Sequence, residues 1–245
     1  MVEQTGVDFG LSKATFEPRL GRPVNLDATR PLRACELYSP AERLADGVIH
    51  VAGVFLSLVA ITVMITIAAF LQDGVTIASI AIYGFGVFCV FLASAAYHLI
   101  DLPDWRWLLR RFDHAAIFLK IAGTYTPFAA ISLGEVEGAL LLAAVWGIAA
   151  VGAPLKLFAP GRFERIAVWL YLLQGWLVVV MLGPLAAAIS TPALICLIAG
   201  GVIYTVGVFF FLWEKLPFHN AIWHGCVLTA SGFMYAAVLN GVALA

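Results

Sequence analysis

The residues of this sequence with the clearest chemical potential are five histidines set among long apolar stretches. Two of them, His219 and His224, stand five positions apart in PFHNAIWHGCVLTAS, at the start of the last apolar stretch. Neutral imidazole is the commonest metal ligand among side chains, and a helix presents two ligands on one face at a spacing of three or four. Asn220 and His224 have that spacing, but an amide oxygen is a poor zinc ligand beside imidazole. The stretch could therefore be a metal site, an altered metal site or a polar membrane boundary.

The elements that must position these residues are predicted to be membrane-spanning helices. Of the 245 residues, 62% are hydrophobic and 12% are charged, whereas a soluble domain carries about 25% charged residues. A spanning helix needs about 20 apolar residues, and the predicted spans are 46–71, 76–100, 113–133, 138–158, 165–183, 192–213 and 219–243. The predicted fold class is all-α, a polytopic integral membrane protein with a seven-transmembrane helix bundle. Membrane lipids are the expected partners of these apolar spans. A net charge of −1 argues against nucleic acid as a partner.

Two domains are predicted, a flexible cytoplasmic tail over residues 1–38 and a seven-helix transmembrane domain over 39–245. The tail mixes prolines with charges of both signs and has no apolar run, which excludes a signal peptide. In SPAE at 39–42, serine and glutamate predict a capping box with proline at the first helical position. The first helix should therefore begin before the membrane. The four scattered cysteines form neither a disulfide framework nor a paired metal motif.

The basic residues predict the orientation of the bundle. Thirteen of the 14 lysines and arginines lie before the first span or beside the loops on the same side, and Lys120 lies inside the third span. The charged residues in the loops on the opposite side are all acidic, namely Asp73, Glu135 and Glu137. By the positive-inside rule the N-terminus is cytoplasmic and the C-terminus lies outside.

This orientation places all five histidines in one layer at the cytoplasmic side. The layer contains His50 from the first span, Ser94 and His98 from the second, Asp113 and His114 from the third, and His219, Asn220 and His224 from the seventh. Polar groups within membrane helices are costly, so their clustering favours a functional site. Three protein ligands are usual for catalytic zinc, and a nearby carboxylate can act as a general base. Asp46 shares a helix stripe with His50 and is expected to orient the His50 ring, so both are candidates for supporting a metal site.

Four stretches resemble the hemolysin III family: the spacing of Glu42, Asp46 and His50, SAAYH at 94–98, DHAAIFLKIAGTYTPF at 113–128 and NAIWH at 220–224. That family is the bacterial branch of the progestin and adiponectin receptor proteins and is grouped with the alkaline ceramidases. The resemblance covers residues 38 to 243 and implies a multi-pass protein of the bacterial inner (plasma) membrane.

The resemblance also implies a zinc site. In the adiponectin receptor branch the zinc ligands are the histidine of S-x3-H and two histidines spaced H-x3-H, which match His98, Asn220 and His224 here. The chain therefore departs from the pattern at Asn220. The resemblance makes Asp113 and Ser94 the catalytic residues, as the base and as a hydrogen-bond donor.

Three outcomes are open at the metal site. Zinc could be bound by His98 and His224 with His219 or His50 completing the set, the site could hold a weaker or different metal, or the polar cluster could hold no metal. His219 is displaced by about 100° around the helix from the matching position. It could reach the metal only if the first turn of the last span is not yet helical.

The favoured function is hydrolysis of a lipid amide or ester bond by a zinc-dependent, ceramidase-like enzyme at the cytoplasmic side of the bundle. The alternative is a non-enzymatic membrane-homeostasis or lipid-sensing protein. Cytolysis, which the family name implies, is disfavoured because seven apolar spans describe a resident membrane protein. An ion pathway is disfavoured because the polar residues are confined to one depth.

Overall fold

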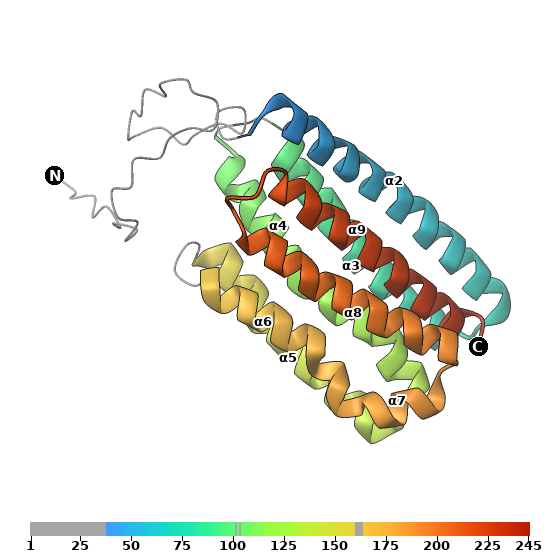
Figure 1. Ribbon diagram of the computed structural model, residues 1–245. Coiled ribbons are helices and arrows are strands. Elements are labelled where there is room, and N and C mark those ends of the chain that lie inside the picture. Colours follow the sequence, from blue (N-terminus) through green and yellow to red (C-terminus); the bar gives the residue numbers. More distant parts are fainter. Residues whose placement is uncertain (1–37, 101, 103, 160–163) are drawn as a thin grey trace, which may run out of the picture.

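The computed structural model describes residues 38–100, 102, 104–159 and 164–245, and Figure 1 shows these as a bundle of helices. Within the described residues, seven helical stretches are long and apolar enough to cross a membrane, which confirms the predicted seven-helix fold. They are Pro40–Leu71, Gly74–Leu99, Arg106–Ser132, Glu135–Phe158, Ile166–Ala188, Thr191–Leu212 and His219–Ala243. The predicted tail over 1–38 lies outside the described residues, apart from Tyr38.

The first two helices begin with side-chain caps that the sequence encodes. Helix α2 (Pro40–Leu71) begins at the predicted capping box, in which Ser39 and Glu42 each accept a backbone hydrogen bond from the other. The helix therefore starts six residues before the predicted span. Asp73 caps helix α3 (Gly74–Leu99) by accepting a hydrogen bond from the Thr76 backbone N–H.

The middle spans contain two departures from regular α-helix. Helix α4 (Arg106–Pro127) ends at a proline and continues directly as the π-helix η1 (Phe128–Ser132). The fifth span comprises helix α6 (Glu164–Trp176), the 3₁₀-helix η2 (Leu177–Met181) and helix α7 (Leu182–Ala188). It extends beyond the predicted end at 183 because Pro184 lies in the first turn of α7, where a backbone N–H has no helical partner. The remaining elements are α5 (Glu135–Phe158), α8 (Thr191–Leu212), α9 (His219–Val238) and the π-helix η3 (Leu239–Ala243).

Close backbone packing brings α3 and α4 together. A Cβ atom on Gly86 would lie 3.1 Å from the carbonyl oxygen of Leu119, and one on Gly123 would lie 3.1 Å from that of Ile82. Small residues at such crossings let membrane helices approach closely. The crossing holds the end of α3 beside the start of α4, so the helix ends that carry His98 and Asp113 lie at one end of the bundle.

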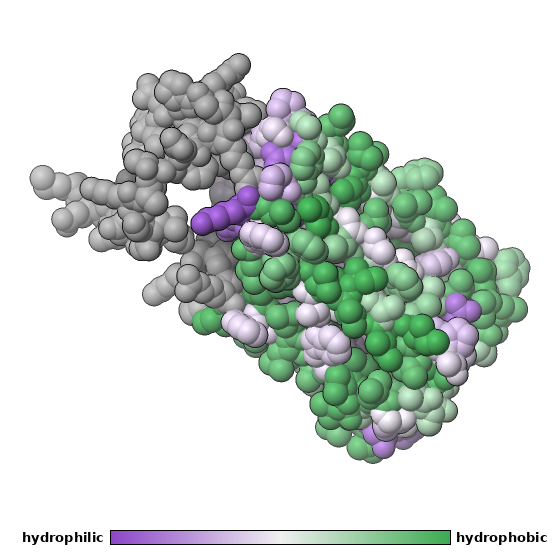
Figure 2. Space-filling model, in the orientation of Figure 1, coloured by the Kyte–Doolittle hydropathy of each residue, from purple (hydrophilic) through white to green (hydrophobic). Residues whose placement is uncertain are grey.

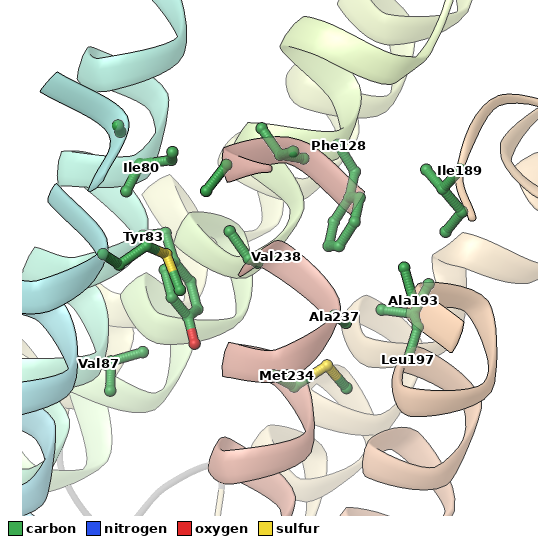
Figure 3. Close-up of a cluster of buried hydrophobic side chains, with 14 of the residues drawn as sticks. Ile80, Tyr83, Val87, Phe128, Ile189, Ala193, Leu197, Met234, Ala237 and Val238 are labelled. Atoms are coloured by element: carbon green, nitrogen blue, oxygen red, sulfur yellow. The ribbon is translucent and has the colours of Figure 1, made fainter. Parts of the chain in front are cut away.

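The first and last spans are also neighbours, since α9 packs against both α2 and α8 (Figure 1). An apolar cluster fills the half of the bundle remote from the start of α9, and Figure 3 shows side chains of α3, η1, α8 and α9 meeting there. Its members include Tyr83, Val87, Phe128 and Val238. Most of this cluster therefore lies away from the histidine-bearing end of the bundle.

The outer surface matches a lipid environment. Figure 2 shows a mostly hydrophobic face whose most hydrophilic residues lie toward its two ends. Large apolar side chains point outward, among them Phe70 and Phe158, which are more than four-fifths exposed. In water such a surface would be an aggregation hazard, whereas in a bilayer it contacts acyl chains.

Candidate metal centre

Four side chains from three helices converge at the end of the bundle where α2 and α9 begin. They are Asp46 and His50 of α2, His98 of α3 and His224 of α9, and one potential ligand atom from each lies within 4.8 Å of all the others. The Asp46 carboxylate lies among the three rings, with Oδ1 2.6 Å from Nδ1 of His224 and Oδ2 3.3 Å from Nδ1 of His98.

The three imidazole rings also contact one another. The His50 ring stacks on that of His98 with centroids 4.8 Å apart, and its centroid is 4.3 Å from that of His224. The His98 and His224 rings meet edge to face at 4.6 Å. Three histidines that are distant in the sequence therefore form one contiguous cluster.

Local helix geometry explains how each helix contributes. Asp46 and His50 are spaced i, i+4, so they lie on one face of α2. His98 lies in the last turn of α3, and His224 lies in the second turn of α9. Because α2 packs beside both of these helices, Asp46 and His50 both contact the other two histidines.

These residues fit a bound metal ion. His50 has a side chain that is only 2% exposed, and its Nε2 makes no hydrogen bond with any described residue, although Oδ2 of Asp46 lies 3.5 Å away. A buried polar atom without a partner costs about 1–3 kcal/mol, and a metal ion would satisfy it. Three imidazoles and a carboxylate are donors that zinc and other transition metals accept.

The structure brings together some of the predicted ligands and leaves others apart. His98 and His224 belong to the cluster, together with His50, which the sequence suggested as a supporting residue or as the ligand that completes the set. Asp46, suggested only as a supporting residue, belongs to it as well. His219 and Asn220 lie outside this group. The geometry therefore favours His50 over His219 as the third imidazole.

Asn220 has a different partner. Its side chain hydrogen-bonds the Tyr38 phenol, and the His219 ring lies 6.1 Å from the Tyr38 ring. Burial raises the pKa of Tyr38, and the hydrogen bond from Asn220 offsets part of this effect. Both positions at the start of α9 thus face Tyr38.

The two predicted catalytic residues lie in buried positions. Asp113 and Ser94 are each 8% exposed, and Ser94 lies one turn before His98 on the same face of α3. Asp113 is not in the group of four, and no hydrogen bond or ion pair joins it to another described residue. Their catalytic roles stay predictions.

Known proteins are similar in sequence to this chain across most of its length. It is 37% identical to "Hemolysin-3 homolog" of Bacillus subtilis (strain 168) over 206 residues, which cover 83% of this chain and 95% of that protein. It is 39% identical to "Hemolysin-3" of Bacillus cereus over 198 residues, 81% of this chain and 90% of that protein. The "Monocyte to macrophage differentiation factor" of Homo sapiens is 29% identical over 167 residues, 64% of this chain and 67% of that protein.

No solved structure matches the chain significantly. The sequence pattern of the family described as "Haemolysin-III related" matches residues 40–235, from the first residue of α2 to within the last span. This match contains every member of the group of four. The chain belongs to the haemolysin-III related family of membrane proteins.

Proposed function

We propose that this membrane protein is a zinc-dependent hydrolase that cleaves an amide or ester bond of a lipid. The observation that carries the proposal is the convergence of His50, His98, His224 and Asp46 at one end of the bundle. Such a cluster of metal-binding groups within apolar helices marks a functional site. We also propose that the N-terminus and the metal-binding group lie at the cytoplasmic side of a bacterial inner membrane. The distribution of basic residues supports the orientation, and the Bacillus relatives support the membrane.

The histidines would hold the metal, and Asp46 would orient them. An ionised carboxylate only accepts hydrogen bonds, so its 2.6 Å contact requires a proton on Nδ1 of His224 and leaves the Nε2 lone pair free. Carboxylates commonly orient metal-binding histidines in this way. When bound, a metal ion would polarise the scissile carbonyl and lower the pKa of water toward neutrality.

Asp113 and Ser94 would supply proton transfer and orientation. The Asp113 carboxylate would accept a proton from the attacking water and return it to the departing amine or alcohol. The Ser94 hydroxyl, one turn from His98, would donate a hydrogen bond to the carbonyl oxygen of the substrate. Addition of water and cleavage of the C–N or C–O bond would release a fatty acid.

The position of the site supports a lipid as the substrate. It lies at the end of a bundle whose sides are strongly apolar. A lipid can keep its acyl chains in the bilayer while its headgroup linkage reaches this depth. A water-soluble substrate would gain nothing from the apolar surroundings.

The test is release of fatty acid from a panel of lipid amides and esters by zinc-loaded protein in liposomes, followed by mass spectrometry. We expect Asp113→Ala to retain zinc and lose turnover, because Asp113 lies outside the group of four. His114→Ala is the matched control and should retain both, since His114 is also outside that group. Zinc-loaded wild-type protein that releases no fatty acid from any of these lipids would contradict the proposal.

A second candidate function is a non-enzymatic lipid-sensing protein with a structural metal. The nearly complete burial of the His50 side chain, together with four potential ligands, favours it, because structural zinc sites are closed by four protein ligands. In that case Asp113→Ala would leave the lipid response unchanged, and His98→Ala would alter it.

A further inference from the structure

The carboxylate of Glu42 joins the beginnings of the two helices that supply most of the metal-binding group. Its Oε2 accepts a hydrogen bond of 2.8 Å from the backbone N–H of Ser39, at the start of α2. Its Oε1 accepts one of 2.9 Å from the backbone N–H of Phe218, the residue directly before α9. Glu42 is 8% exposed, so this carboxylate is a buried link between residues 176 positions apart.

Phe218 adopts a backbone conformation that needs external support. Its φ of 61° lies in the left-handed region, where no other described non-glycine residue lies. A bulky residue adopts this conformation at an energetic cost and keeps it only when its surroundings hold it there. The Phe218 side chain makes no capping hydrogen bond to α9. The Glu42 carboxylate instead provides both a hydrogen-bond acceptor and a negative charge at this helix N-terminus.

Glu42 and Asp46 form two successive contacts between α2 and α9. They are one helical turn apart on the same face of α2. Glu42 accepts the N–H of Phe218, and Asp46 contacts Nδ1 of His224. The first contact therefore sets where α9 begins, and the second lies where its metal-binding histidine projects.

We propose that Glu42 is a positioning residue of the metal centre, which holds the start of α9 so that His224 faces Asp46. The inference rests on the metal centre of the proposed function and is independent of lipid turnover. Glu42 is not a member of the group of four. Removal of Glu42 should change metal affinity even though all four members of the group remain.

The test is a zinc titration of detergent-purified protein in competition with a chromophoric chelator. We expect Glu42→Ala to weaken zinc binding about 10–100-fold, the usual effect of losing an outer support of a metal site. Glu42→Gln keeps one acceptor for two N–H groups and should have an intermediate affinity. Ser39→Ala is the matched control, because it removes the Ser39 side-chain cap of α2 without touching α9, and it should bind zinc as the wild type does.

A second variant tests the route through Phe218. Glycine adopts positive φ without strain, so adding Phe218→Gly to Glu42→Ala should recover at least part of the lost affinity. A role in α2 capping alone would be unaffected by this change. Wild-type affinity in Glu42→Ala, with only the unfolding temperature lowered, would overturn the inference, as would an absence of rescue.

The result is separable from the fate of the proposed function. Zinc binding that depends on Glu42 in a protein without hydrolytic activity would support this inference and refute the hydrolase. Hydrolysis with zinc affinity that is insensitive to Glu42 would do the reverse. Wild-type protein that binds no zinc would overturn both.

Discussion

Asp46 and His224 are 178 positions apart in the sequence, and Oδ1 of the first lies 2.6 Å from Nδ1 of the second. This contact joins the first spanning helix to the last. It places a carboxylate among three imidazoles, at an end of the bundle where outward-facing side chains of α2, such as Leu44 and Val48, are apolar.

Asp46→Asn should weaken metal binding. The amide has nearly the size of the carboxylate but lacks its charge and has a single acceptor oxygen, so it cannot serve both Nδ1 atoms that Asp46 faces. We expect a loss of about 10–100-fold in zinc affinity, measured by competition titration. Asp73→Asn, a cap at the opposite end of α3, is the control. Equal zinc affinities in Asp46→Asn and wild-type protein would show that the carboxylate has no part in the site.

His50→Ala should lose bound metal, whereas His219→Ala should keep it. His50 is in the group of four, and His219 is not. Metal analysis of the purified variants should show loss of metal in the first and wild-type content in the second. The reverse pattern would mean that the histidine beside Asn220 fills the position that the family pattern assigns to residue 220.

Gly86→Ala should destabilise the bundle by about 1–3 kcal/mol, as overpacking of a tight contact does. The added methyl group would lie 3.1 Å from both the Leu119 carbonyl oxygen and the Lys120 Cα, which are backbone atoms of α4. The measurement is the free energy of unfolding in mixed micelles with increasing denaturing detergent. Gly147→Ala is the control, since a Cβ there meets nothing within 4 Å. Equal stability of the two variants would show that α3 and α4 are less tightly packed than described.

Tyr125→Phe should lower stability by about 1–3 kcal/mol. It leaves two part-buried backbone groups of a membrane-spanning segment without partners, at a depth where water cannot replace the hydroxyl. The Tyr125 hydroxyl donates to the Gly175 carbonyl oxygen at 2.6 Å and accepts from the Val178 N–H at 3.0 Å, where α6 gives way to η2. Tyr235→Phe is a matched control, as the hydroxyl of Tyr235 has no hydrogen bond with a described residue. Unfolding of the two variants at the same detergent fraction would contradict the expectation.

The spans were predictable because membrane length and hydropathy leave strong signals in a single sequence. The start of α2 was predictable from the Ser39 and Glu42 capping box for the same reason: the interaction is local. The end of the fifth span was not, because Gly183 and Pro184 resemble a break, although Pro184 lies in the first turn of α7.

The metal-binding group was only partly predictable. His98 and His224 were found through family motifs, whereas the inclusion of Asp46 and His50 depends on α2 lying beside α9. Helix adjacency is a long-range property that hydropathy does not encode. Lys120 illustrates the same limit. Its ammonium group lies over the Tyr204 ring of α8, 3.6 Å from the centroid, and the position of Lys120 within the third span does not indicate this partner.

Elemental analysis of protein purified with zinc present tests whether histidines from three helices form a metal centre. We expect about one zinc ion per chain in the wild type. We expect loss of that ion in His98→Ala and retention in His114→Ala, because only His98 belongs to the group of four. Wild-type protein without metal, or His98→Ala with undiminished zinc, would show that these histidines do not form a metal centre.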